Sequence, residues 1–332
     1  MADHSNADQS LTVYNIKYLV IAGGGPLGFR YMGALLHLRD EGVWKIENIK
    51  KMYSTSIGSI VSAILCLGYD SDVVKRYLID RPWHDALKIT GRQIFDAYYT
   101  KGLVDKEPIY TIFKPLLEAK DLHMHTTMQE FYDYCGIELN IYTCDLNTFE
   151  LVRISYKTHP DMQLIRALTM SCAIPGMVRP HCVDNHCFVD GGVICNYPIS
   201  QCIHDIEENE LETEKTTNFP DILGVNYELV SSSTSINVQI TDKSTLLDFM
   251  LAFSINSMNY ISETTKKCTP ELRHQILCKV NDSPISLTSI SAALNSSATR
   301  SQLMVAGEFD AKTFMEASKG CHQATANICH EN

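Results

Sequence analysis

Near its start the chain contains two consecutive strand-loop-helix units whose loops consist of small residues. The apolar run YLVIA at 18–22 predicts a buried strand, which leads into GGGPLG and a helix that begins near Gly28. A second strand at 49–53 ends in STSIG, with Ser56 at its centre, and an apolar helix follows at 57–67. Strands that alternate with helices pair in parallel under a cover of helices. The order therefore predicts an α/β fold with a mainly parallel central sheet flanked by helices.

Further elements follow along the chain, separated by turn residues. Strands are expected at 137–144, 149–155, 187–189, 222–227 and 274–280. Helices are expected at 71–78, 108–118, 127–134, 161–175, 246–261 and 301–317. The first two of these strands form a hairpin. Ser71 is the expected N-cap of its helix, and Thr127 with Glu130 forms a capping box whose helix ends at Gly136.

The 332 residues are expected to form one large domain. We place this domain at 16–318, between a flexible N-terminal segment at 1–15 and a flexible tail at 319–332. Inside it, the aromatic-rich stretch 83–125 is a candidate cap over the site, and ordinary helical packing is the alternative. The acidic stretch 207–218 is expected to be a solvated loop.

The charge of the chain argues against two classes of partner. A formal net charge of −11 without a basic cluster argues against nucleic acid and against electrostatic docking on anionic membranes. The N-terminus lacks the pattern of a secretory signal, and no stretch approaches the roughly 18 uncharged apolar residues of a spanning helix. We therefore expect a cytoplasmic protein, and any lipid surface would have to be met peripherally, through apolar contacts. The sequence does not define its oligomeric state.

The cysteines and histidines do not form a recognisable metal module. Twelve cysteines in a chain without secretory features indicate reduced thiols rather than a disulfide framework. His181, Cys182, His186 and Cys187 are residue types that bind zinc. Their spacing matches no known zinc site, so we expect a hairpin turn at 183–186 and no bound metal.

The glycine loop by itself has two interpretations. Gly23-x-Gly25-x-x-Gly28, after a strand and before a helix, satisfies the dinucleotide-binding fingerprint. That interpretation requires an acidic residue at the end of the second strand, to hold the ribose hydroxyls. The second strand ends in the sequence YSTS, which contains no carboxylate. We therefore expect no nucleotide, and no other cofactor.

Ser56 has the surroundings of a nucleophile. A serine on a sharp turn between a strand and a helix needs small residues two positions before and after it, and Ser54 and Gly58 satisfy that need. The start of a helix also favours developing negative charge. A hydroxyl is a weak nucleophile until a base activates it, so the sequence must supply that base as well.

Two kinds of base could activate Ser56. An α/β-hydrolase would place a histidine after the serine, and His204 or His274 would be candidates, but that fold has several strands before its nucleophile and only one precedes the Ser56 unit. Asp190 is the better candidate because it ends a strand, where open α/β sheets form their ligand crevice. Gly191 and Gly192 allow a sharp turn there, and an ordinary Asp-Gly turn is the alternative.

Together and in this order, GGGPLG, STSIG and FVDGGVICNYP resemble the patatin-like phospholipase family. The segment SCAIP at 171–175 adds to the resemblance, which extends from Tyr18 to about Ala317. It implies that Ser56 is the nucleophile and Asp190 the base, acting as a dyad without Ca²⁺ or any other metal.

The resemblance also implies an oxyanion hole built from the glycine loop. Its N–H groups would come from Gly23, Gly24, Gly25 and Gly28, with Gly24 and Gly25 favoured. Pro26 has no N–H to give.

The sequence departs from the family pattern at two positions. Leu27 stands where the family has Arg or Lys, so Arg30 is a candidate for the missing cation. Ser54 stands where the serine motif begins with glycine, a change that matters if the position needs a positive φ.

The resemblance implies a serine hydrolase that cleaves acyl esters of phospholipids or other lipids, at a membrane or lipid-droplet surface. The alternative is a catalytically weak or inactive lipid-binding or scaffolding member of the same fold.

Overall fold

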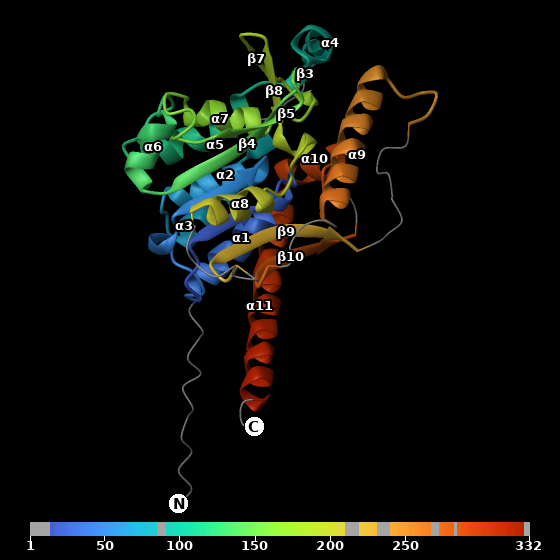
Figure 1. Ribbon diagram of the computed structural model, residues 1–332. Helices are drawn as coiled ribbons and strands as arrows, with labels where there is room; N and C mark the ends of the chain where they lie inside the picture. The colour runs from blue at the N-terminus through green and yellow to red at the C-terminus, as the bar shows by residue number, and fades with distance from the viewer. Residues whose placement is uncertain are drawn as a thin grey trace, which may run out of the picture.

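The computed structural model describes residues 14–84, 91–209, 219–230, 240–266, 272–281 and 284–328. Its strands are β1 (Tyr18–Ile21), β2 (Lys51–Thr55), β3 (Gly102–Val104), β4 (Glu138–Asp145), β5 (Glu150–Ile154), β6 (Gly176–Val178), β7 (His181–Val183), β8 (His186–Asp190), β9 (Ile222–Leu229) and β10 (His274–Val280). Its α-helices are α1 (Leu27–Asp40), α2 (Ile57–Cys66), α3 (Ser71–Asp80), α4 (Gly91–Thr100), α5 (Glu107–Glu118), α6 (Met128–Cys135), α7 (Leu164–Ser171), α8 (Ile199–Asn209), α9 (Leu246–Lys266), α10 (Leu287–Asn295) and α11 (Ser297–Ile328). Two short 3-10 turns, η1 (Ile46–Asn48) and η3 (Gly191–Val193), complete the described elements (Figure 1).

The described strands form one large sheet and one small one. The large sheet has eight strands in the order β10-β9-β1-β2-β4-β8-β7, with β5 paired to β4 outside this path. Its first five strands run parallel, whereas β5, β8 and β7 pair in antiparallel fashion. β3 and β6 form the small parallel sheet. The predicted α/β fold with a mainly parallel sheet is confirmed.

Helices cover both faces of the large sheet, because successive side chains of a buried strand point to opposite faces. In β1, Leu19 and Ile21 contribute to the main core, which also contains side chains of α1, α2, α7 and α11. Val20, between them, packs in a second core with Tyr53 and the apolar side of α8. The result is a three-layer arrangement with the sheet in the middle (Figure 1).

Several local predictions are confirmed. The hairpin of β4 and β5 forms as expected, and so does the two-residue turn that joins β7 to β8. In that turn Asp184 and Asn185 both have positive φ. Thr127 and Glu130 make both hydrogen bonds of the predicted capping box, and Gly136 ends the helix in the left-handed conformation.

Other local predictions are wrong in position or extent. The N-cap of α3 is Asp70, and the Ser71 hydroxyl instead donates to Asp40 and accepts from Arg39. α7 begins at Leu164, and α11 continues to Ile328 through much of the segment expected to be a flexible tail. The helices α4, α8 and α10 and the small sheet were not predicted.

Part of the predicted acidic loop at 207–218 is helical, since α8 runs to Asn209. Residues 210–218 lie outside the described residues, as do residues 1–13 of the predicted N-terminal segment. Among the described helices, none is long and apolar enough to cross a membrane.

Candidate active site

Ser56 occupies a strained turn between β2 and α2. Its φ of 55° and ψ of −129° are rare for a residue with a side chain, and such strain is concentrated at functional sites. The turn is also crowded, because a Cβ on Gly58 would lie 2.4 Å from the carbonyl oxygen of Ile21 and 2.7 Å from that of Ala22. The start of α2 therefore packs against the end of β1 only with glycine at position 58.

The structure brings Ser56 and Asp190 into direct contact. The Ser56 hydroxyl donates a hydrogen bond of 2.6 Å to Oδ2 of Asp190. The other carboxylate oxygen, Oδ1, accepts the N–H of Gly192 at 2.7 Å. Asp190 is fully buried and Ser56 is 6% exposed, so the pair is nearly withdrawn from solvent.

Pairing of the strands explains why these distant residues meet. β4 lies between β2 and β8, with Tyr142 opposite Thr55 and Thr143 opposite Asp190. The turn after Asp190 runs close to this strand, because a Cβ on Gly191 would lie 2.5 Å from the carbonyl oxygen of Tyr142. The Asp-Gly-Gly sequence thus lets the carboxylate approach the serine across one intervening strand.

Burial gives Asp190 the proton affinity of a base. Removal from water raises the pKa of its carboxyl to about 7, while the hydrogen bonds from Ser56 and Gly192 act in the opposite direction. Within the described part of the chain, no lysine or arginine forms an ion pair with Asp190. Near neutral pH the carboxylate can both exist and accept a proton.

Two residues that the sequence analysis missed hold the backbone of the site. The Ser171 hydroxyl accepts the N–H of Ser56 at 2.9 Å and donates to the carbonyl oxygen of Tyr142 at 2.7 Å. The carbonyl oxygen of Asn196 accepts the N–H of Gly23 at 2.9 Å, and its side-chain amide donates to the Gly23 carbonyl at 3.3 Å. Both residues belong to segments that carry the family resemblance, SCAIP and FVDGGVICNYP, but nothing in these segments alone indicates the hydrogen bonds that the two residues make.

The glycine loop offers fewer N–H groups than expected. The N–H of Gly28 donates to the carbonyl of Gly25 at 3.0 Å, and that of Gly23 donates to Asn196, so neither is available for an oxyanion. Both glycines serve close packing instead: a Cβ on Gly23 would lie 2.3 Å from Asn196 Oδ1, and one on Gly28 2.3 Å from Ile57 Cγ1.

Gly24 and Gly25 keep their N–H groups available. No acceptor within the described residues takes either of them. Gly25 has a φ of +52°, a conformation that favours glycine, and it lines the same cavity as Ser56.

An apolar cavity of about 210 Å³ adjoins Ser56. Ser56, Gly25 and Cys172 are among the residues that line it. The remaining wall is almost wholly aliphatic and aromatic, and it includes Phe29, Met32, Ile60, Val61, Ile64, Leu78, Trp83, Ile112, Ile174, Ile290 and Leu294. Pockets for drug-sized ligands usually measure about 300–1,000 Å³, so this one suits a slender alkyl chain.

The structure gives Arg30, the candidate cation for the oxyanion hole, other partners. Its guanidinium makes two hydrogen bonds to Asp310, at 2.5 and 2.8 Å, and a third to the carbonyl of Lys279 at 3.0 Å. The side chain therefore ties α1 to α11 and β10. Leu27, which replaces the family's basic residue, is buried in the main core.

Ser54 does not need a positive φ, since it lies in β2 and is absent from the positive-φ positions of the described residues. The departure from glycine therefore causes no backbone strain. Its buried hydroxyl has no hydrogen-bond partner within the described residues.

Neither candidate histidine, His204 or His274, is among the residues that line the cavity beside Ser56. His204 is on α8 beside Glu208, and the ring of His274 packs against Tyr14 at 4.1 Å. His186 of the β7–β8 hairpin bonds to Asp145 at the end of β4. In the same hairpin, the sulfur atoms of Cys182 and Cys187 are 3.3 Å apart. Within the described residues, no group of three or more His, Cys, Asp or Glu is arranged to hold a metal ion.

Comparison with known proteins gives matches in sequence and in structure. Residues 19–203 match the family described as patatin-like phospholipase. The chain is 28% identical over 270 residues to the uncharacterized protein R571 of Acanthamoeba polyphaga mimivirus, a match that covers 76% of this chain and 87% of that protein. It is 28% identical over 189 residues to the probable lipid hydrolase 463L of Invertebrate iridescent virus 6, covering 56% of this chain and 63% of that protein. Among solved structures, VipD from Legionella pneumophila aligns with a TM-score of 0.43 and 15% identity, over 89% of this chain and 67% of VipD.

Proposed function

The chain belongs to the patatin-like phospholipase family, so it is a lipid acyl hydrolase, and we propose that Ser56 and Asp190 perform its reaction. The observation that carries this proposal is the 2.6 Å hydrogen bond between the hydroxyl on the strained turn and the buried carboxylate. A nucleophile and a base within hydrogen-bond reach are the minimum that acyl transfer requires.

The reaction follows from the positions of the groups. Asp190 Oδ2 takes the proton of the Ser56 hydroxyl while Oγ attacks the carbonyl carbon of the ester. The N–H groups of Gly24 and Gly25 stabilise the negative charge on the carbonyl oxygen. The alcohol leaves with the proton from Asp190, and an acyl-serine remains. Asp190 then takes a proton from water, which attacks the acyl-serine, and release of the fatty acid returns that proton to Ser56.

The apolar cavity supports an acyl ester with a hydrocarbon chain as the substrate. An alkyl chain buried among Ile60, Ile64 and Ile174 would gain about 0.8 kcal/mol for each CH₂ removed from water. Its carbonyl would then lie beside Ser56 and Gly25, which line the same cavity. We infer that the cavity holds the acyl chain, while the rest of the lipid stays outside.

The net charge of the protein favours apolar over electrostatic contact with the lipid surface. With a formal net charge of −11, the protein is not attracted electrostatically to an anionic membrane. Contact with a membrane or lipid droplet would therefore rely on apolar side chains.

A fluorophosphonate probe, which reacts with activated serines, tests the dyad. We expect wild type to be labelled, and Ser56→Ala to lose both labelling and ester hydrolysis by about 10³-fold or more. Ser62→Ala is a matched control, because Ser62 is a buried serine on α2 whose hydroxyl has no hydrogen-bond partner within the described residues. An unlabelled wild type would instead favour the alternative of a lipid-binding protein without catalysis.

A further inference from the structure

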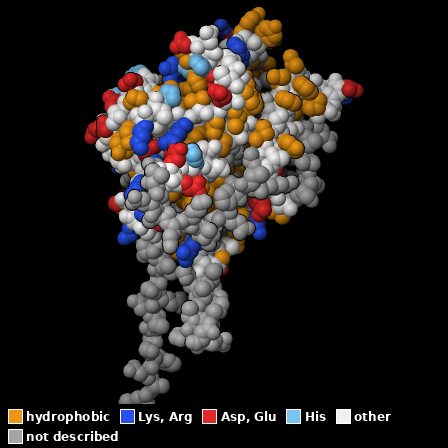
Figure 2. All heavy atoms as spheres, viewed as in Figure 1, with side chains coloured by type: hydrophobic (Ala, Val, Ile, Leu, Met, Phe, Trp, Pro, Cys, Tyr) orange, Lys and Arg blue, Asp and Glu red, His pale blue; other side chains and the backbone are white. Residues whose placement is uncertain are grey.

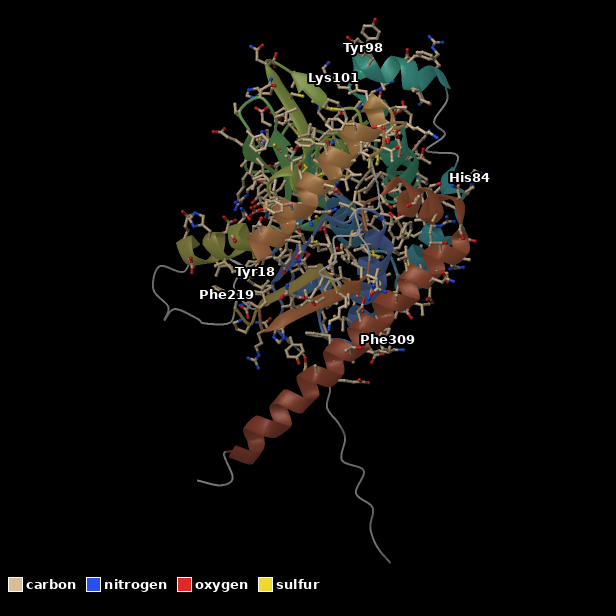
Figure 3. All side chains as sticks on the ribbon, turned by 90° about the vertical axis from the view of Figure 1, so that its right-hand side faces the viewer. Tyr18, His84, Tyr98, Lys101, Phe219 and Phe309 are labelled. Atoms are coloured by element: carbon tan, nitrogen blue, oxygen red, sulfur yellow. The ribbon has the colours of Figure 1, made fainter. Side chains whose placement is uncertain are left out.

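Two groups of exposed aromatic side chains lie at one end of the molecule. On α4, Phe95, Tyr98 and Tyr99 are 82%, 80% and 78% exposed. On α9, Phe253 is 65% exposed and Phe249 is 51% exposed. Figures 1 and 3 place α4 and one end of α9 at the same end of the protein, and Figure 2 shows hydrophobic side chains gathered over both. We call the exposed sides of these two helices the aromatic face.

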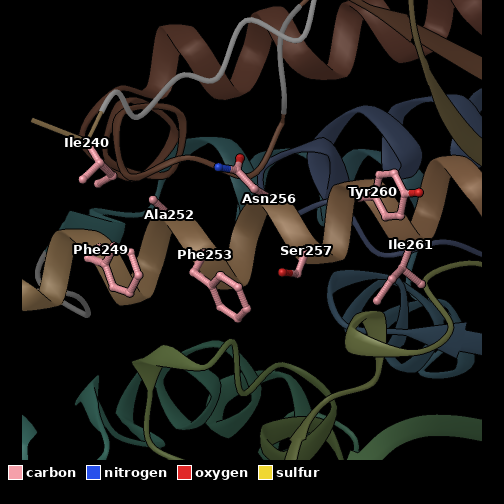
Figure 4. Close-up of a pocket in the computed structure, with 8 residues that line it drawn as sticks. All are labelled: Ile240, Phe249, Ala252, Phe253, Asn256, Ser257, Tyr260 and Ile261. Atoms are coloured by element: carbon pink, nitrogen blue, oxygen red, sulfur yellow. The ribbon is translucent and has the colours of Figure 1, made fainter.

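The outer side of α9 is unusually free of charge for a surface helix. From Phe249 to Ser262 its sequence, FMLAFSINSMNYIS, contains no charged residue. Phe249, Phe253 and Tyr260 line a shallow groove along this side, and Figure 4 shows their side chains ranged along the helix. A surface helix of a soluble protein normally has charged residues on its outer side. The outer side of α9 is therefore suited to an apolar environment.

The inner side of the same helix reaches the catalytic site. Ile255 and Met258 pack in a small apolar cluster with Ile174, which also lines the cavity beside Ser56. Met258 also packs against the turn that follows the catalytic aspartate, because a Cβ on Gly192 would lie 2.9 Å from its Cε. The aromatic face thus continues, through one helix, into the wall of the acyl cavity.

Charge indicates what covers the aromatic face. An anionic membrane would select clusters of lysine and arginine, which neither helix has: α4 carries Arg92 and Asp96, and α9 is uncharged over its central turns. Tyrosine is enriched at membrane–water interfaces, and phenylalanine is common on the apolar face of helices that lie in the interface. The composition of the face fits a lipid surface without net charge.

We propose that the aromatic face of α4 and α9 docks onto lipid surfaces that carry no net charge, and that this docking brings lipid acyl esters to Ser56. The proposal rests on the proposed hydrolase function for its purpose, but the docking itself can be measured without catalysis. It assigns the binding of the surface to Phe95, Tyr98, Phe249 and Phe253, and the cleavage of the ester to Ser56 and Asp190.

Flotation with phosphatidylcholine vesicles tests the docking. We expect Phe253→Glu, alone and with Phe95→Glu, to lower the vesicle partition coefficient about tenfold or more, because a carboxylate would have to enter the apolar layer. Phe309→Glu on α11 is the matched control: Phe309 is 69% exposed, but it lies between Glu308 and Asp310, and its variant should bind vesicles within twofold of wild type. Circular dichroism and thermal unfolding verify that each variant is folded.

Two substrates separate this inference from the proposed function. With p-nitrophenyl butyrate, which is soluble, Phe253→Glu should react within twofold of wild type, whereas hydrolysis of vesicle phospholipid should fall in step with binding. Failure of wild type to cleave the soluble ester would count against the proposed function alone, because flotation would still report docking.

Three results would overturn the docking proposal. The first is vesicle binding by Phe253→Glu that equals wild type, and the second is an equal loss in Phe309→Glu. The third is a wild-type dimer in light scattering that Phe253→Glu converts to monomer, which would make the face a contact between protein chains.

Discussion

The two ends of β2 show what burial does to a carboxylate with and without a cation. At the start of the strand, Lys51 lies 3.8 Å from Glu138 and 3.7 Å from Asp205, which also pairs with Arg153 at 2.9 Å. Just beyond its other end, Ser56 bonds to Asp190, which has no ion-pair partner among the described lysines and arginines. Acidic side chains are buried at both ends of β2, but only at the start of the strand do basic side chains pair with them.

The difference appears in the proton affinities. Burial would raise the pKa of Asp205, but the Tyr53 hydroxyl and the charges of Arg153 and Lys51 hold it below its ordinary value. Burial without such partners raises the pKa of Asp190 to about 7. A paired carboxylate stabilises the fold and stays ionised, whereas an unpaired one can exchange its proton at neutral pH.

Neutralising Asp190 and Asp205 in turn tests the difference between the two ends of β2. Asp190→Asn should lower kcat/KM for a soluble ester by about 10³-fold or more, because the Ser56 proton loses its acceptor. Asp205→Asn should keep kcat/KM within about threefold but lower the free energy of unfolding by about 1–3 kcal/mol, since it leaves Arg153 and Tyr53 short of a partner. Comparable activity losses in the two variants would contradict the distinction.

Stability should shift in opposite directions in the same two variants. Because the folded pKa of Asp190 lies above its unfolded value of about 3.9, ionisation destabilises the fold as pH rises from about 4 to 7. Asp190→Asn should therefore be more stable than wild type at pH 8, by more than about 1 kcal/mol, and lose that advantage near pH 4. Urea unfolding at the two pH values measures both effects, and a variant less stable than wild type at pH 8 would argue against a dry, unpaired carboxylate.

The crowding at the catalytic end gives the next largest effect. Gly58→Ala should displace the turn that carries Ser56, because its Cβ would meet two carbonyl oxygens of β1 and the following residue. We expect at least a tenfold loss of kcat/KM together with a lower thermal midpoint. Gly91→Ala is the control, as no described atom lies within 4 Å of the added Cβ and its φ is not positive. Wild-type kinetics in the Gly58→Ala variant would show that the turn tolerates a side chain.

Removing the Arg30 side chain should have the smallest effect on activity, and it tests whether a cation contributes to the oxyanion hole. Because its guanidinium is bound to Asp310 and Lys279, Arg30→Ala should lower the free energy of unfolding by about 1–3 kcal/mol and leave kcat of the folded enzyme within twofold. Steady-state kinetics well below the unfolding transition measure this. A tenfold drop in kcat would restore the idea that Arg30 supports the oxyanion.

The two candidate catalytic residues could be predicted from the sequence because each is identified by the residues next to it. The turn at Ser56 depends on its small neighbours, and Asp190 is recognised from the strand before it and the glycines after it. Among the helices that were not predicted, α8 does have a signal in the sequence. The spacing of one helical face is present in Ile199, Cys202, Ile203 and Ile206, which form its apolar side.

Other features depend on tertiary pairing and have no local signature. Arg30 looks available for the oxyanion hole until α11, far along the chain, brings Asp310 to it. The hydroxyl of Ser171 acquires its role only because the folded chain carries it to the N–H of Ser56. The aromatic residues of α4 have helical spacing, but the sequence does not say whether their helix packs inside or, as the structure has it, faces outward.

The rate of fluorophosphonate labelling of Ser56, measured from pH 5 to pH 9, tests whether Asp190 is the base that activates Ser56. If Asp190 is the base and burial sets its pKa, the second-order rate constant should rise about tenfold per pH unit at low pH and level off above about pH 7. The Asp190→Asn variant should react slowly with no such rise. A wild-type rate that stays flat across this range, or a rise that survives in Asp190→Asn, would contradict a dyad whose base is the buried aspartate.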